Sequence, residues 1–177
     1  MQRPRSITVI GIIGVIWGLV GTIGGLGGML VILTAPEWFM ALLKREGSPE
    51  LATLFTQVIG DPYTRWWSVF LTGVQTALNA MLLFGAIGLL RLQPKGWWLM
   101  MGYATGAILW AVVDRLVLDP KVYQPFRERY QIEDRTARPV PRFTLGLLYP
   151  AISAYILTRP KIMALYKQDD DSPSQEG

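Results

Sequence analysis

The chain contains no cysteine and no histidine. A protein without these residues forms no disulfide, has no thiolate nucleophile, and cannot build a Cys/His zinc site or a His-ligated haem. Histidine is also the commonest general base. We therefore expect a protein that is not an enzyme and that binds no metal and no cofactor. If the protein is instead a membrane-embedded enzyme, Asp114 and Tyr103 would form its acid–base pair.

Charged residues are also scarce, at 17% of 177 residues, whereas 51% are hydrophobic. The charges leave four long apolar tracts, at residues 7–33, 66–90, 97–118 and 143–158. A helix needs about 20 apolar residues to cross the hydrocarbon core of a bilayer, and the first three tracts meet this length. The fourth would rely on bilayer thinning or on snorkelling of Arg142 and Arg159, and a buried soluble helix is its alternative. We predict an all-α fold, an integral membrane bundle of four transmembrane helices.

The net charge of +4 does not indicate nucleic-acid binding. The basic residues are scattered through segments that flank the apolar tracts, so lipid headgroups are their nearer partner and no nucleic acid is expected. The first tract follows two arginines, but it is about twice as long as the apolar core of a signal peptide, and we interpret it as a retained span. We predict one transmembrane domain over residues 1–167 and a disordered acidic tail over 168–177.

Basic residues close to span ends indicate the orientation. Four spans place both termini and the short turn 91–96 on one side, where the basic residues are Arg3, Arg5, Arg91, Lys95, Arg159, Lys161 and Lys167. The other side carries more basic residues in longer loops, but the positive-inside bias is strongest for short loops. We therefore expect cytoplasmic N and C termini. The architecture resembles that of small four-span bacterial membrane proteins, which implies the bacterial inner (plasma) membrane.

The two longer loops differ in character. Residues 34–65 predict two short amphipathic helices, in which Leu51, Leu54 and Phe55 follow helical spacing. These helices would lie in the headgroup layer, cap the bundle, or form a lid over a cavity. Residues 119–142 are polar and rich in proline and arginine, which indicates either a solvated loop or a surface for anionic lipid or an acidic partner.

The first tract carries a repeating seam of glycines at steps of three and four residues. The seam consists of Gly11, Gly14, Gly18, Gly21, Gly25 and Gly28. Such steps keep all six glycines on one narrow stripe of a helix. In lipid, a stripe without side chains lets another helix approach closely, as in a glycine zipper. The neighbouring helix could belong to the same chain or to another subunit. Gly102 and Gly106 give the third tract a smaller step of the same kind.

Polar residues inside the apolar tracts are the remaining candidates for a functional site. One face of the second tract carries Thr72, Gln75, Thr76 and Asn79. These side chains would either form hydrogen bonds between helices or line a polar pathway. Asp114 stands late in the third tract beside Arg115, and an intramembrane charge is a functional hypothesis by default, although a local ion pair is the alternative.

The leading functional hypothesis is an accessory, assembly or structural subunit that acts through close helix–helix packing. Its partners would be membrane lipid and another membrane protein, or a second copy of the chain, bound through the first tract. The alternative is a small transporter or channel that uses Gln75, Asn79 and Asp114 on its pathway.

Overall fold

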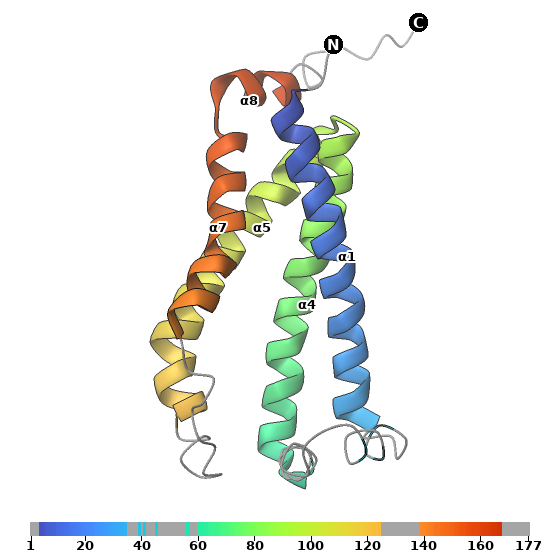
Figure 1. Cartoon of the computed structure of the whole chain (residues 1–177), viewed down its shortest axis with the longest axis vertical. Helices are drawn as coiled ribbons and strands as arrows, with labels where there is room; N and C mark the ends of the chain where they lie inside the picture. The colour runs from blue at the N-terminus through green and yellow to red at the C-terminus, as the bar shows by residue number, and fades with distance from the viewer. Residues whose placement is uncertain are drawn as a thin grey trace, which may run out of the picture. The chain divides into compact units, whose positions relative to one another are not determined.

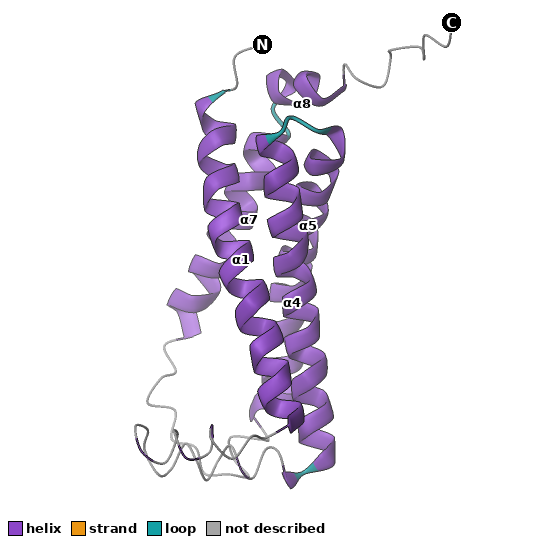
Figure 2. Cartoon of the chain, turned by 90° about the vertical axis from the view of Figure 1, so that its right-hand side faces the viewer, coloured by secondary structure: helices purple, strands orange, loops and turns teal. Residues whose placement is uncertain are grey.

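The computed structural model describes residues 4–34, 39, 41, 45, 56, 60–124 and 139–167, without the side chains of 119–123 and 139–146. Within these ranges the chain is helical apart from short turns and contains no strand, which confirms the predicted all-α class (Figure 2). The elements are α1 (Arg5–Thr34), α4 (Pro62–Leu90), α5 (Pro94–Val113), the π-helix η1 (Asp114–Tyr123), α7 (Pro139–Leu157) and α8 (Pro160–Lys167) (Figure 1). Most of the interfacial helices predicted in the first loop, and the acidic tail, lie outside the described residues.

In the part of the chain that the structure describes, three helical stretches are long and apolar enough to cross a membrane. They are Arg5–Thr34, Pro62–Leu90 and Pro94–Leu118, with mean hydropathies of 2.2, 1.6 and 1.3. These lengths and compositions indicate a membrane protein. The fourth predicted span falls in α7, whose described apolar part, Leu147–Leu157, is shorter than a span requires. The count of four spans therefore stays a prediction.

The chain divides into two compact units, of which the first comprises residues 1–18 and 81–177 and the second residues 19–80. Helices α1 and α4 contribute to both units. In the second unit, α4 begins at Pro62, four residues before the predicted start. Asp61 explains the difference, because its carboxylate accepts a hydrogen bond from the backbone N–H of Thr64 at 3.3 Å and so caps the helix. Proline is also favoured in the first turn of a helix.

In the first unit, α4 and α5 are joined by a tight turn at residues 91–93. The backbone N–H of Gln93 donates to the carbonyl of Gly88 at 2.9 Å, and that of Leu92 donates to Leu89 at 3.0 Å. This pair of bonds defines a Schellman motif, in which the residue at the position of Leu92 adopts the left-handed conformation. Leu92 has a φ of 56°, although glycine is the usual residue there.

We expect the variant Leu92→Gly to be more stable than Leu92→Ala by about 1 kcal/mol. Both variants remove the half-buried leucine side chain, but only glycine removes the cost of a Cβ in the left-handed region. The free energies of unfolding of the two variants in the same detergent would measure the difference. Equal stabilities would contradict the assigned conformation of the turn.

The helix that contains the third tract continues beyond the predicted end of the tract at residue 118. The prediction of a loop from residue 119 onwards is wrong for its first residues, because η1 continues the helix through Pro120 to Tyr123. Proline lacks a backbone N–H and its ring clashes with a carbonyl of the preceding turn of an α-helix. We attribute the wider π-helical turns to this conflict.

Helix α8 was not anticipated from the sequence. Ile162 and Tyr166, four residues apart, are buried, whereas Lys161 is exposed. The Tyr166 hydroxyl donates to the carbonyl of Leu89 at 3.3 Å, near the end of α4. This bond and the buried face hold α8 against the end of α4 within the first unit.

Candidate functional site: helix-packing glycines and polar groups

The first three glycines of the seam are buried in the first unit. A Cβ on Gly11 would lie 2.6 Å from the side chain of Leu90, and one on Gly14 would lie 2.8 Å from the Cβ of Ala86. A Cβ on Gly18 would lie 2.6 Å from the backbone nitrogen of Leu83. Real Cβ atoms essentially never approach other atoms this closely, so the absence of side chains on α1 is what lets α4 pack here.

The other three glycines face α4 within the second unit. A Cβ on Gly21 would lie 2.5 Å from the amide nitrogen of Asn79, and one on Gly25 would collide with the hydroxyl of Thr76. At Gly28 the nearest atom is the Cγ2 of Thr72 at 3.9 Å, which is an ordinary contact. The contact is therefore tight at the first two positions and looser at the third.

The facing residues of α4 repeat the spacing of the seam in the reverse direction. In the order of the glycines they are Leu90, Ala86, Leu83, Asn79, Thr76 and Thr72. Steps of three and four on both helices are the pattern of two helices packed antiparallel along one narrow stripe. Within each unit, the neighbour of the seam is thus α4 of the same chain. The sequence had left open whether this neighbour belongs to the same chain or to another subunit.

Two other glycines of α1 provide a contrast. Gly24 and Gly27 are exposed, and a Cβ on either would meet no heavy atom within 4 Å. They are interleaved with the seam in sequence but do not belong to its stripe. They supply matched controls for any substitution within the seam.

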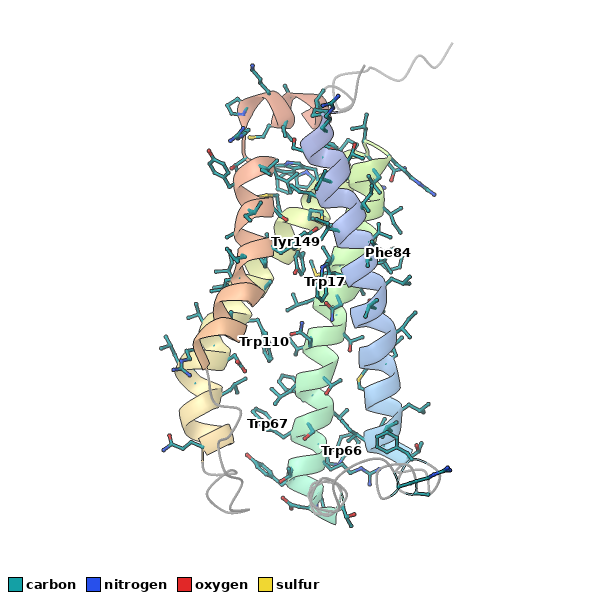
Figure 3. All side chains as sticks on the ribbon, viewed as in Figure 1. Trp17, Trp66, Trp67, Phe84, Trp110 and Tyr149 are labelled. Atoms are coloured by element: carbon teal, nitrogen blue, oxygen red, sulfur yellow. The ribbon has the colours of Figure 1, made fainter. Side chains whose placement is uncertain are left out.

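Tyr149 of α7 connects to the seam in the first unit (Figure 3). Its hydroxyl donates to the carbonyl of Ile10 at 2.9 Å, and its ring lies 6.3 Å from that of Tyr103. A Cβ on Gly14 would lie 2.6 Å from the Tyr149 oxygen. In an α-helix the carbonyl of residue 10 is also bonded to the N–H of residue 14. A glycine at 14 therefore leaves the second lone pair of this carbonyl accessible.

The sequence analysis did not predict this hydrogen bond. The signal was the spacing of Tyr149 and Ser153, four residues apart in the apolar part of α7, Leu147–Leu157. Ser153 is fully buried. The side chains of a pair at this spacing share one face of α7, but the spacing does not show which helix they meet.

The polar residues of α4 do not act as one face. The Thr76 hydroxyl donates to the carbonyl of Thr72 in its own helix at 2.7 Å, and the amide of Asn79 lies against Gly21. Gln75 differs from them, because it is exposed and is not among the residues of α4 nearest to the seam glycines. The predicted polar face thus consists of three residues packed towards α1 and one amide at its edge.

The remaining predicted residues are spread over the first unit. Asp114 is half-buried at the start of η1 and, like the exposed Arg115, has an interaction partner. A Cβ on Gly102 would lie 3.0 Å from the flexible end of Met81, and Gly106 is half-buried on α5. The steric requirement for glycine is therefore weaker at Gly102 than in the tight part of the seam.

A close approach between α4 and α5 involves glycines that were not predicted from the sequence. A Cβ on Gly88 would lie 2.5 Å from the Cα of Gly96, and one on Gly85 would lie 2.9 Å from the side chain of Met100. Gly85 and Gly88 are three residues apart, which is a recognisable spacing. Their partner Gly96 lies one residue before the third apolar tract, so it was not counted among the glycines of the predicted spans.

No protein family, curated protein or solved structure matches the chain. Among the described residues, no group of three or more acidic residues is arranged to hold a metal ion.

Proposed function

We propose that the protein is an accessory or assembly subunit with four membrane spans, which binds a helix of another membrane protein at Gln75. The observation that carries the proposal is the exposure of this amide near the middle of α4. We further propose that the protein resides in the bacterial inner membrane with both termini in the cytoplasm. The basic residues near the span ends support that orientation.

An exposed amide in the middle of an apolar span needs a partner. Transfer of an amide into an apolar medium without a compensating hydrogen bond costs roughly 2–7 kcal/mol, and acyl chains offer neither donors nor acceptors. Glutamine side chains in membranes satisfy this need by hydrogen bonding across helices. Thr76 bonds to its own helix and Asn79 packs against Gly21, so Gln75 is the group of this set that is left for a neighbour.

The alternative is a small transporter or channel whose pathway includes Gln75, Asn79 and Asp114. The close contact between Asn79 and Gly21 argues against it, because this contact fills the space that a substrate would need beside the amide. An exposed glutamine by itself suits either function. The two are separated by whether Gln75 supports association or flux.

Cross-linking from single cysteines tests the proposal, because the chain has no cysteine of its own. The half-buried Leu78 lies about 60° from Gln75 around the helix, whereas the exposed Ala77 points about 160° away from it. We expect Leu78→Cys, but not Ala77→Cys, to form a discrete cross-linked adduct with another membrane protein in native membranes. Adding Gln75→Leu should reduce this adduct at least several-fold, and Gln75→Asn should retain part of it.

A cross-link from Leu78→Cys that is unchanged by Gln75→Leu would overturn the assignment of Gln75. Loss of a solute flux in Gln75→Leu and Asn79→Leu, with folding and association intact, would favour the transporter instead. The far-ultraviolet circular dichroism and the melting temperature of each variant would show whether folding is preserved.

A further inference from the structure

One end of the first unit collects exposed cationic side chains from several segments. They are Arg5, Arg91, Lys95, Arg159 and Lys161. The start of α1, the α4–α5 turn, the start of α5 and helix α8 all lie at this end (Figures 1 and 2). Contacts connect these segments: the indole Nε1 of Trp97 donates to the carbonyl of Leu157 at 3.1 Å, and Tyr166 donates to Leu89. The five exposed cations therefore lie on segments at the same end of the unit, and we refer to this end as one surface.

The helix ends at this surface do not engage the cations. Carbonyls at the C-terminus of a helix commonly attract lysine or arginine. Here aromatic donors occupy the carbonyl of Leu157 at the end of α7 and that of Leu89 near the end of α4. Backbone N–H groups of the turn 91–93 bond the carbonyls of Ile87, Gly88 and Leu89 in the last turn of α4. These carbonyls are thus bonded by groups other than the cations.

Four of the five cations have no partner within the described part of the chain. The guanidinium of Arg159 donates a hydrogen bond of 3.1 Å to the hydroxyl of Tyr155. It also forms a cation–π contact, with its Cζ 4.8 Å from the centroid of the Tyr155 ring. No interaction is formed by the side chains of Arg5, Arg91, Lys95 and Lys161 among the described residues. Their own segments contain no acidic residue, as residues 5–34, 91–96 and 159–167 show. Among the described residues, no acidic side chain compensates the positive charge of this surface.

We propose that this surface binds the phosphate groups of anionic phospholipids, with α8 lying in the headgroup layer. Helix α8 has the required polarity, because Ile162 and Tyr166 face the protein and Lys161 is exposed. Trp98, near the start of α5, is 69% exposed, and tryptophan is enriched at the membrane interface. Exposed cations at that depth are attracted by anionic headgroups. The lipid would anchor this end of the protein independently of any contact at Gln75.

Native mass spectrometry of the full-length protein with added phosphatidylglycerol or phosphatidylcholine tests the proposal. We expect phosphatidylglycerol to be retained in preference to phosphatidylcholine. The double variant Arg91→Gln/Lys161→Gln should bind it about 30-fold more weakly, because each basic residue near the surface contributes about fivefold. The control is Arg45→Gln/Arg115→Gln, which removes the same charge from exposed positions elsewhere and should change the affinity less than threefold.

Equal retention of the two lipids, or equal loss in the test and control variants, would overturn the proposal. Displacement of the bound lipid by millimolar inorganic phosphate would assign the surface to a free anion and overturn it as well. The melting temperature of each double variant identifies any effect that arises from misfolding. Because the Gln75 cross-link does not involve these residues, failure of one proposal leaves the other standing.

Discussion

Replacing Gly18 with alanine is expected to lower the free energy of unfolding by about 2–3 kcal/mol, the upper range for overpacking of a single site. The new Cβ would lie 2.6 Å from the nitrogen and 2.8 Å from the Cα of Leu83. Both are backbone atoms, so rotation of a side chain cannot relieve the collision. Helix α4 would have to move away from α1, and the contacts at Gly14 would loosen with it. Unfolding in mixed detergent micelles, followed by tryptophan fluorescence, would measure the change.

The matched control is the same substitution at Gly24, six residues further along α1. A Cβ there meets nothing within 4 Å. Alanine exceeds glycine in helix propensity by about 1 kcal/mol, so Gly24→Ala should leave the stability unchanged or raise it by up to that amount. Opposite signs at the two positions are the specific expectation. Equal effects would mean that the close contact between α1 and α4 is not formed at Gly18.

Replacing Gly96 with alanine is expected to cost about 3 kcal/mol and to open the α4–α5 turn. The Cβ would lie 2.5 Å from the Cα of Gly88 and 2.6 Å from the nitrogen of Leu89, so backbone meets backbone again. The turn between them contains Arg91 and ends beside Lys95. Limited trypsin digestion should therefore cleave the variant at these two residues faster than the native protein.

Gly102→Ala is the control for this crossing, because it lies on the same helix. Its Cβ would meet the terminal methyl group of Met81 at 3.0 Å, and a flexible side chain can withdraw from such a contact. We expect a change in stability of less than about 1 kcal/mol and an unchanged digestion pattern. Slow cleavage of Gly96→Ala, equal to that of Gly102→Ala, would contradict the backbone crossing at Gly88.

The position of Gln75 illustrates how far periodicity can be taken. The spacing of Thr72, Gln75, Thr76 and Asn79 predicts a common face, since each is three or four residues from another. The face is about 100° wide, however, and Gln75 stands at its edge. Only the contacts of Thr76 and Asn79 with the glycines of α1 show that these two side chains are packed, whereas the Gln75 amide is exposed. The proposed binding of a partner helix at Gln75 depends on this difference in exposure.

The sequence by itself determined the long apolar helices and the glycine stripe of α1. Apolar tracts of about 20 residues or more dictate helices in a membrane, because each backbone group must bond within its own segment. Glycines at steps of three and four necessarily form one smooth stripe. Both conclusions follow from the geometry of a single helix, which needs no knowledge of its neighbours.

The tertiary structure decided which segments meet. It placed α4 of the same chain on the seam within each unit, brought Gly96 against Gly88, and bonded Tyr149 to the carbonyl of Ile10. It also collected the cations of four segments around α8. These contacts join residues that are far apart in the chain or belong to different tracts. Their partners are selected by the fit of one surface against another, and a repeating pattern within one tract carries no record of that choice.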